Sequence, residues 1–446
     1  MTRKTFSIPY TPSPSWPSVN PRPLLAIRPH PPLRTPSLPS PPRQDIFHKD
    51  YVLSTHIVPA AFPRLVPDIP LPLLEIPPRS DSIAPAERQE KVATAVKQLI
   101  ERQECFTQGR MLGGHGQKPL WNCVNRYVRT ERRNTAGTGL TLFVAHANGF
   151  PKELSETMLR SLLDLPAAPL VDEIWSWEAV QHGDSALLNA ENLSGIFDWQ
   201  DNARDIANFL LHYLPDEVAL TPLPTRLLRI SQAASDARKT QGYHQRKIVV
   251  VGHSFGGTTS ALTAVNFPKL FSSLILVDPV VVNYGSYDFG SELIRGALIR
   301  RDTWSSREEA LRLFKQRPFF ASWHPDVLKS YVDYGSTTDP SGGVRLKMTP
   351  IQESLCFANV FPPLEVWELL EKLDEDITLR WVVPAVSFVG EQETKVRVWR
   401  RPANASNIVF PFVGHLIVQE APVELAQDIS TFLLEKYGTP HFKAAL

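Results

Sequence analysis

This chain of 446 residues has few cysteines, almost no net charge and no long apolar run. Its cysteines, Cys105, Cys123 and Cys356, are odd in number and widely spaced. That spacing excludes a disulfide framework or a cysteine metal cage and indicates a reducing, intracellular compartment. The net charge of +1 gives no basis for nucleic acid as a partner. Apolar runs stay well short of the roughly 18 residues of a membrane span, so we expect no stable membrane insertion.

Acidic residues are absent from the first part of the chain, where proline is abundant. Thirteen prolines fall by Pro42, and the first acidic residue is Asp45. Proline fixes φ and removes a backbone donor, so neither helix nor sheet is expected there. Arginine and serine without acids are also typical of transit peptides, but those need an amphipathic helix that the prolines oppose. We predict that residues 1–45 are a disordered, proline-rich leader, and that an extended arm follows to Pro78.

Beyond the leader, apolar strand-like runs alternate with segments of helical period. Such alternation predicts an α/β fold with a mostly parallel central sheet and flanking helices, whose chemistry lies at the carboxyl ends of the strands. Strands are expected at residues 127–129, 140–145, 174–177, 249–252, 274–277, 381–390 and 407–412. Helices are expected at residues 86–103, 152–163, 201–214, 258–266 and 422–437, with a loop insertion at 215–245.

A strand, a sharp turn and a helix meet at residues 249–257, Val-Val-Val-Gly-His-Ser-Phe-Gly-Gly. Gly-x-Ser-x-Gly at such a turn is typical of a nucleophile elbow, in which a strained backbone holds a serine hydroxyl above the sheet. The glycines on either side of Ser254 leave room for that backbone. The N–H of Phe255 would then lie beside the oxyanion of a reacting carbonyl. A tight connection without chemistry is the alternative.

Residues 283–376 interrupt the alternation and are mostly helical in period. A helical insertion between the last strands of the core predicts a lid over the serine. The alternative is a peripheral insertion that does not contact the substrate. The chain is thereby divided into a leader, a first part of the core, a lid and a second part of the core, at residues 1–45, 46–282, 283–376 and 377–446.

A serine hydroxyl needs a base within hydrogen-bond reach and a carboxylate that orients this base. His415 is the candidate base, because it lies between the last strand and the last helix, where a loop can hold the imidazole over the elbow. We expect a structural role for His253. Two carboxylates follow core strands, Asp278 and Glu393, and spacing does not decide between them. The more apolar strand before Asp278 mildly favours that residue, since a buried carboxylate is costly without a partner.

The oxyanion hole needs a second backbone N–H besides that of Phe255. The turn His146-Ala147-Asn148 follows the strand at 140–145 and corresponds to the usual His-Gly-x turn of such enzymes. Asn148 is therefore the expected second donor. We expect His146 to brace the turn.

Together these motifs resemble the α/β-hydrolase superfamily. The chain is similar, more narrowly, to the fungal hydrolases of host-selective toxin biosynthesis and to the peroxisomal acyl-CoA hydrolase of mycophenolic acid formation. The resemblance spans roughly residues 51–437. It is carried by residues 146–153 (His-Ala-Asn-Gly-Phe-Pro-Lys-Glu), 252–257 (Gly-His-Ser-Phe-Gly-Gly), 277–280 (Val-Asp-Pro-Val), 414–416 (Gly-His-Leu) and an arm at 53–63.

The resemblance implies that the triad acid follows the strand after the elbow, which is Asp278, with Glu393 second. It also implies a cytoplasmic or peroxisomal location, although the chain ends in Lys-Ala-Ala-Leu where relatives often carry a Ser-Lys-Leu type signal. Four arginines of the lid are candidates to meet coenzyme A phosphates, with a solvated helix face as the alternative. They are Arg295, Arg300, Arg301 and Arg307.

We therefore expect a serine hydrolase that cleaves a small-molecule ester or acyl-CoA thioester through an acyl-enzyme, in fungal secondary metabolism, without metal or organic cofactor. Ser254 attacks, His415 moves the proton, Asp278 orients His415, and the N–H groups of Asn148 and Phe255 hold the oxyanion. The alternatives are an acyltransferase or cyclase that uses the same acyl-serine, and a non-catalytic ligand-binding protein. Epoxide hydrolase or dehalogenase chemistry would need a carboxylate at the nucleophile position.

Overall fold

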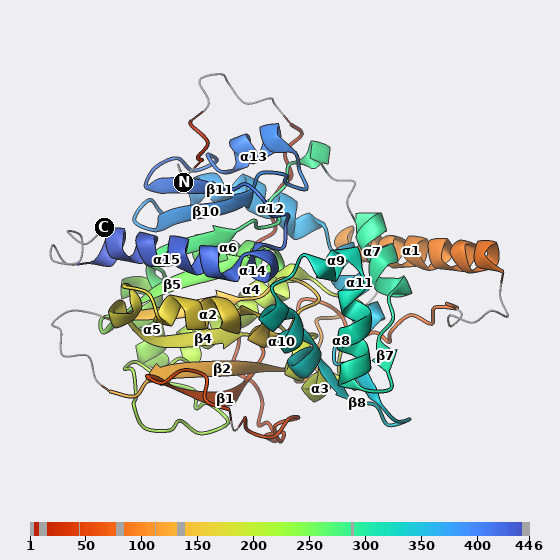
Figure 1. The fold of residues 1–446 in the computed structure, drawn as a ribbon, viewed down its shortest axis with the longest axis horizontal. Helices are drawn as coiled ribbons and strands as arrows, with labels where there is room; N and C mark the ends of the chain where they lie inside the picture. The colour runs from red at the N-terminus through yellow and green to blue at the C-terminus, as the bar shows by residue number, and fades with distance from the viewer. Residues whose placement is uncertain are drawn as a thin grey trace.

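The computed structural model describes residues 4–8, 16–43, 45–76, 84–111, 113–131, 139–286 and 290–438. A central sheet runs through the molecule and is built from eight strands (Figure 1). They are β1 (Tyr51–Pro59), β2 (Trp121–Arg129), β3 (Gly139–Ala145), β4 (Val171–Trp177), β5 (Arg246–His253), β6 (Ser273–Val277), β10 (Thr378–Pro384) and β11 (Ala405–Phe410). Their order is β1-β2-β4-β3-β5-β6-β10-β11, antiparallel from β1 to β4 and parallel from β4 to β11. The prediction of a mostly parallel sheet is confirmed.

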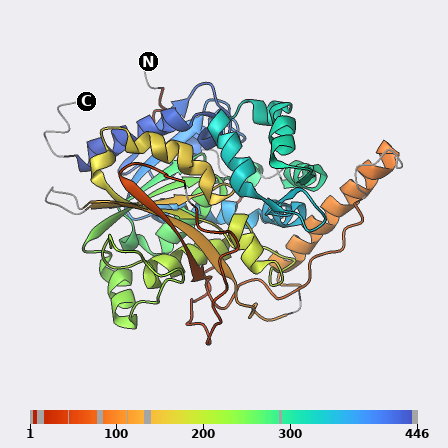
Figure 2. The same cartoon turned by 60° about the horizontal axis from the view of Figure 1, so that its bottom comes forward.

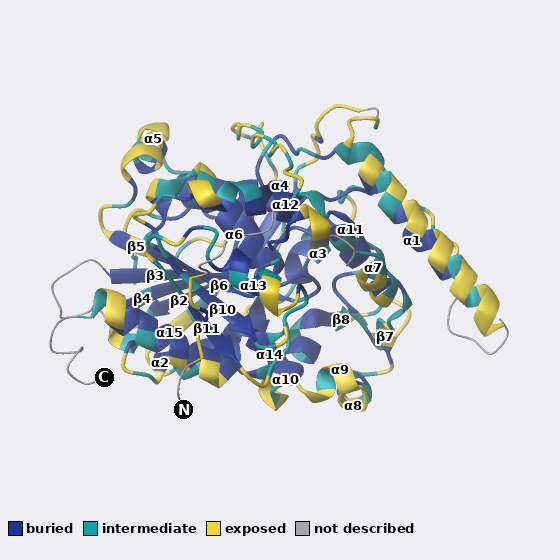
Figure 3. Ribbon diagram, turned by 90° about the horizontal axis from the view of Figure 1, so that it is seen from above, coloured by how far each residue is buried: buried dark blue, intermediate teal, exposed yellow. Residues whose placement is uncertain are grey.

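Helices cover both faces of this sheet, as its apolar strands require. The main ones are α2 (Glu156–Leu163), α4 (Trp199–His212), α6 (Phe255–Asn266) and α15 (Pro422–Tyr437). Val250 packs in the apolar cluster of α4 and α6, whereas Val249 and Val251 pack on the opposite face with α2 and α15. This alternation follows from the pleat of a strand. Figure 3 shows the resulting buried interior of strands between the helical layers.

The strand expected at residues 381–390 is shorter in the structure. β10 ends at Pro384, which has no N–H to donate to the ladder. The chain then turns and enters α13 (Glu391–Arg397) after Gly390, whose φ is 80°. Two further helices were not predicted, α3 (Gly183–Asn189) and, within the expected loop insertion, α5 (Gln232–Gln241).

The segment predicted to be a lid, residues 283–376, contains more than helices. Its helices are α7 (Gly290–Ile299), α8 (Arg307–Lys315), α9 (Pro318–Ala321), α10 (Pro325–Gly335), α11 (Pro350–Ala358) and α12 (Phe361–Leu369). It also holds a small antiparallel sheet in the order β7-β9-β8, formed by Thr303–Trp304, Val344–Leu346 and Ser336–Thr338. We keep the name lid segment for α7 to α11, because α12 packs on α6 and its Val366 and Trp367 belong to the sheet's own core.

The predicted helix at residues 86–103 is present as α1 (Pro85–Thr107). It packs on α7 and α11 through an apolar face that includes Val92, Val96 and Leu99. One end of α1 projects from the body of the molecule (Figure 2). Within the described residues, no helix is long and apolar enough to cross a membrane.

The leader differs from the disordered segment expected for residues 1–45. Its described residues form no helix, but they lie against the folded body. Phe6 is buried, and its backbone forms two hydrogen bonds with the side chain of Asn407, of 2.7 and 2.9 Å. Arg22 forms ion pairs with Asp198 at 2.7 Å and with Glu365 at 2.8 Å. Composition predicted the lack of helix. It could not predict these contacts, because Asn407, Asp198 and Glu365 lie far from the leader in the sequence.

Candidate active site

Ser254 lies at the sharp turn between β5 and α6. Its φ of 53° and ψ of −119° are values that a residue with a side chain rarely adopts. Glycine is required around it, because a Cβ on Gly252 would lie 2.7 Å from the Cα of Gly257. A Cβ on Gly256 would overlap the carbonyl group of Ala145, at the end of β3. The elbow therefore packs directly on the turn that follows β3.

Three residues that are distant in the sequence meet at this elbow. The Nε2 atom of His415 lies 2.8 Å from the hydroxyl of Ser254, and its Nδ1 lies 2.6 Å from a carboxylate oxygen of Asp278. A carboxylate only accepts, so Nδ1 carries the proton and Nε2 accepts the serine hydroxyl. Asp278 is fully buried, while the His415 side chain is 30% exposed. This arrangement can remove the proton from the serine as it attacks.

Glu393, the second candidate for the acid, is not part of this group. It lies half-buried in α13, and in the described part of the chain no hydrogen bond joins it to His415. The site therefore contains one carboxylate in contact with the imidazole, that of Asp278.

Arg397 is a member of the site that sequence reasoning missed. Its guanidinium is fully buried, pairs with the second carboxylate oxygen of Asp278 and donates to the carbonyl of Pro279 at 2.9 Å. Burial alone would raise the pKa of Asp278, but the charge of Arg397 and the hydrogen bond from His415 lower it below its ordinary value. The carboxylate is thus kept ionised. A buried arginine on an unpredicted helix leaves no periodic signal in the sequence.

His253 precedes the serine and holds the loop of His415. Its Nε2 donates to the backbone oxygen of His415 at 2.9 Å. Burial lowers the pKa of His253 to about 3, with the nearby His415 ring acting in the same direction. A neutral His253 therefore fixes the position of the loop without competing for the proton.

The turn after β3 carries the second expected oxyanion donor, Asn148. Its side chain contacts the Nε2 of His182 at 3.0 Å and donates to the backbone oxygen of Glu353 at 3.4 Å. On the other side, Phe255 is the first residue of α6, so its N–H has no acceptor within that helix. Since the elbow packs on this turn, the two expected donors come from adjacent segments.

Two neutral histidines brace the turn. His146 donates from Nδ1 to the oxygen of Ala147 at 2.8 Å and accepts the N–H of Ala179 at 3.1 Å. His182, which the sequence reasoning did not single out, accepts the N–H of Gly149 at 3.0 Å. Burial lowers the pKa of His146 to about 4 and that of His182 well below its ordinary value. The ring of His182 also stacks on Phe255, with the ring centres 5.8 Å apart.

Comparison with known proteins identifies the family. A model described as the alpha/beta hydrolase family matches residues 142–428, more than half of the chain. The chain belongs to the alpha/beta hydrolase family. A solved structure of the peroxisomal alpha-beta-hydrolase Lpx1 from Saccharomyces cerevisiae has the same fold, with a TM-score of 0.61, 21% sequence identity, and coverage of 89% of this chain and 96% of that one.

Sequence relatives include proteins of the group that the motifs resemble. The chain is 26% identical over 327 residues to the peroxisomal membrane protein LPX1 of Saccharomyces cerevisiae, which covers 68% of this chain and 78% of that protein. It is 28% identical over 193 residues to the type I acyl-CoA thioesterase mpaH of Penicillium brevicompactum, 42% of this chain and 38% of that protein. It is 35% identical over 98 residues to the abhydrolase domain-containing protein AFT2-1 of Alternaria alternata. This match covers 21% of this chain and 36% of that protein.

A buried ionic cluster of this alpha/beta hydrolase lies next to the turn that follows β3. Lys152 is fully buried, and its ammonium contacts Glu153 at 2.9 Å, Asp184 at 3.0 Å and Glu178 at 3.3 Å. Burial would lower the pKa of Lys152, but these carboxylates raise it well above its ordinary value. Glu178 and Asp184 also form, with Cys123, the one group of metal-ligand side chains found among the described residues. In that group both carboxylates pair with the lysine.

The lid arginines of this hydrolase have partners within the protein. Arg300 pairs with Glu353, and Arg301 lies 3.3 Å from Glu309. Arg295 contacts Glu292, and Arg307 donates to the hydroxyl of Ser336. These contacts favour a structural role for the four arginines over direct binding of phosphate.

Proposed function

We propose that this alpha/beta hydrolase is a serine hydrolase that cleaves an ester or acyl-CoA thioester through an acyl-enzyme. The observation that carries the proposal is the position of His415, hydrogen-bonded to Ser254 on one side and to Asp278 on the other. The hydroxyl of Ser254 attacks the carbonyl carbon while Nε2 of His415 takes its proton. The same nitrogen returns the proton to the leaving group, and the N–H groups of Asn148 and Phe255 stabilise the oxyanion. Water, activated by His415, then cleaves the acyl-enzyme.

Hydrolysis is favoured over acyl transfer by the exposure of the imidazole. The side chain of His415 is 30% exposed, so water can reach the base that must activate it. An acyltransferase or cyclase would exclude water from this position, and a non-catalytic binding protein would not need the hydrogen-bonded chain from Ser254 to Asp278.

The biological setting belongs to the same proposal. The similarity to mpaH, named an acyl-CoA thioesterase, supports a thioester substrate. The resemblance to fungal hydrolases of toxin and mycophenolic acid formation supports a role in secondary metabolism. The similarity to LPX1, named a peroxisomal protein, supports an intracellular location that is either peroxisomal or cytoplasmic.

Replacing the nucleophile tests the proposal. Ser254→Ala removes the attacking atom and should lower turnover of p-nitrophenyl esters and acyl-CoA thioesters by up to ~10⁶-fold, the loss seen when a triad serine is removed. It should also abolish covalent labelling by a fluorophosphonate probe. Ser322→Ala, at an exposed serine of the lid segment, is the control and should retain both. Labelling that persists in Ser254→Ala would contradict the assignment of the nucleophile.

A further inference from the structure

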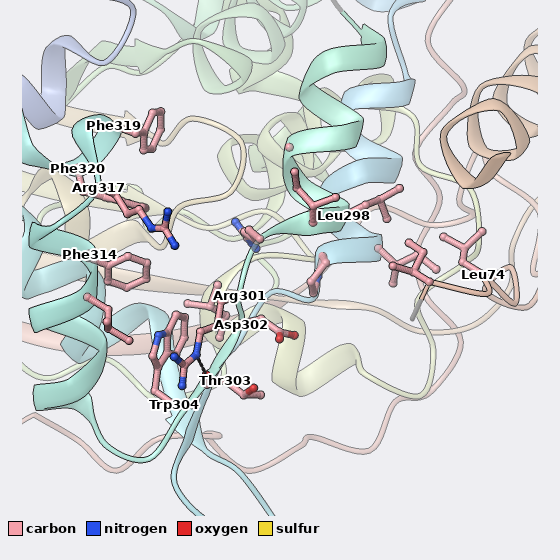
Figure 4. Close-up of a pocket in the computed structure, with 18 of the residues that line it drawn as sticks. Leu74, Leu298, Arg301, Asp302, Thr303, Trp304, Phe314, Arg317, Phe319 and Phe320 are labelled. Atoms are coloured by element: carbon pink, nitrogen blue, oxygen red, sulfur yellow. Dashed lines mark hydrogen bonds between the residues drawn. The ribbon is translucent and has the colours of Figure 1, made fainter. Parts of the chain in front are cut away.

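A large cavity lies between the lid segment and the chain that leads into α1 (Figure 4). Its volume is about 1250 Å³. Ordinary small-molecule sites measure roughly 300–1,000 Å³, so the cavity has room for a long or branched ligand. The described residues that line it do not include Ser254 or His415. It is therefore a space separate from the catalytic residues, and a substrate bound there would occupy it with a part remote from the reacting bond.

One wall of the cavity is aromatic. Trp304, Phe314, Phe319 and Phe320 face it, and Figure 4 shows their side chains gathered on the same side. The ring centres of Phe314 and Phe320 are 4.4 Å apart, and those of Trp304 and Phe314 are 5.1 Å apart. Phe319 is 57% exposed, which is unfavourable for a ring of this size. A flat or apolar group of a ligand would cover this surface.

The lining also carries an excess of positive charge. Four arginines line the cavity against one carboxylate, Asp302. Two of the arginines are paired with carboxylates, as described above, but Arg88 and Arg317 form no ion pair in the part of the chain that the structure describes. The Nε atom of Arg88 is buried without a hydrogen-bond partner. Two guanidinium groups are thus available for an anion, and their planar donor sets match phosphate oxygens.

The cavity shares part of its wall with a small hollow beside the turn that follows β3. Arg300, Tyr331 and Leu346 line the cavity and also a small hollow that reaches Gly149 and Pro151. Arg300 pairs with Glu353, whose backbone oxygen accepts the side-chain hydrogen bond of Asn148. The cavity and the turn that carries Asn148 therefore lie on either side of these shared wall residues.

We propose that this cavity binds the phosphate-bearing leaving group of a thioester substrate, with Arg88 and Arg317 on its phosphates and the aromatic wall against its flat and apolar parts. The inference rests on the proposed function. In the first step the Oγ–C bond to Ser254 forms and the C–S bond breaks. The serine proton passes to Nε2 of His415 and then to the departing sulfur. The cavity holds the portion that leaves as the free thiol.

The test compares two thioesters of the same acyl group. Octanoyl-CoA carries the phosphates, and octanoyl-N-acetylcysteamine has the same thioester without them. Arg88→Gln and Arg317→Gln should each raise KM for octanoyl-CoA about tenfold, the usual effect of losing one charged hydrogen bond. They should leave kcat, and all constants for the short thioester, unchanged. Arg312→Gln is the matched control, because this exposed arginine of α8 does not line the cavity.

Two outcomes would overturn the inference. One is that KM for octanoyl-CoA equals KM for the short thioester in the wild-type protein and in both the Arg88 and Arg317 variants. The other is calorimetric binding of octanoate but not of free coenzyme A, which would make the cavity a site for an acyl carboxylate. If neither thioester is hydrolysed, the proposed function fails, and the titration with coenzyme A, in wild-type and Arg317→Gln proteins, still decides for or against the cavity.

Discussion

Asp278 is constrained from several directions. Its φ of 37° lies in the left-handed region, its N–H donates to Val382 at 2.8 Å, and its carboxylate contacts both His415 and Arg397. Strained backbone in a residue that is not glycine persists where surrounding contacts hold it, and such positions cluster at functional sites. Ser254 shares this property. Both ends of the proposed proton path are thus fixed before substrate binds.

This constraint predicts unequal effects for the two candidate acids. Asp278→Asn would favour the wrong tautomer of His415 and should lower kcat by about 10⁴. Glu393→Gln should change kcat little, because Glu393 lies half-buried in α13 and, among the residues that the structure describes, forms no hydrogen bond with Ser254, Asp278 or His415. The measurement is kcat of both purified variants on one ester or thioester. A collapse in Glu393→Gln alone would contradict the geometry.

The sequence predicted those site residues that lie in a recognisable local pattern. Ser254 has the glycines of an elbow, and His415 lies in the loop before the last helix. Asp278 needed both its strand and the family resemblance to be preferred over Glu393. Arg397 and His182 were missed because their roles depend on contacts made across the fold, which periodicity does not encode.

At the scale of elements, the elbow and the turn that follows β3 form one packed unit. Gly256, on α6, lies against the carbonyl groups of Ala145 and His146. Apolar runs and helical periods predicted the strands and helices of this unit. They did not predict α3, α13 or the small sheet of the lid segment, since short elements depend on turns, caps and neighbours more than on a repeating pattern.

A methyl group at this contact should separate the two elements. Gly256→Ala would push the turn away from the elbow and should reduce kcat by about 10²-fold, comparable to the loss of one oxyanion donor. Gly114→Ala is the control, because a Cβ there would have no neighbour within 4 Å. Steady-state kinetics of the two variants measures the difference. Equal kcat values would show that the contact does not position the turn.

At the scale of the molecule, the leader ties separate parts of the fold together. Arg22 joins Asp198, which caps α4, to Glu365 of α12, and both carboxylates are fully buried. Sequence composition could not reveal this, because proline content describes the backbone and not the partners of a side chain. The leader is therefore expected to contribute to the stability of the whole protein.

Removing the guanidinium tests this contribution. Arg22→Ala leaves two buried carboxylates without their partner, a loss of about 3–5 kcal/mol for a buried ion pair. The thermal unfolding midpoint should fall clearly below that of the wild type. Arg34→Ala, an exposed leader arginine, is the matched control and should unfold like the wild type. A midpoint unchanged in Arg22→Ala would mean that the leader is bound without stabilising the fold.

The contact between the leader and β11 also affects how the protein is made. Val409 donates its N–H to Lys4 at 2.8 Å, so the leader covers the outer edge of β11. Phe6 and Asn407 are separated by 401 positions. This edge consequently stays uncovered until residues synthesised early meet residues synthesised late. Without the leader, β11 would present an unpaired strand edge, a feature that promotes aggregation with other chains.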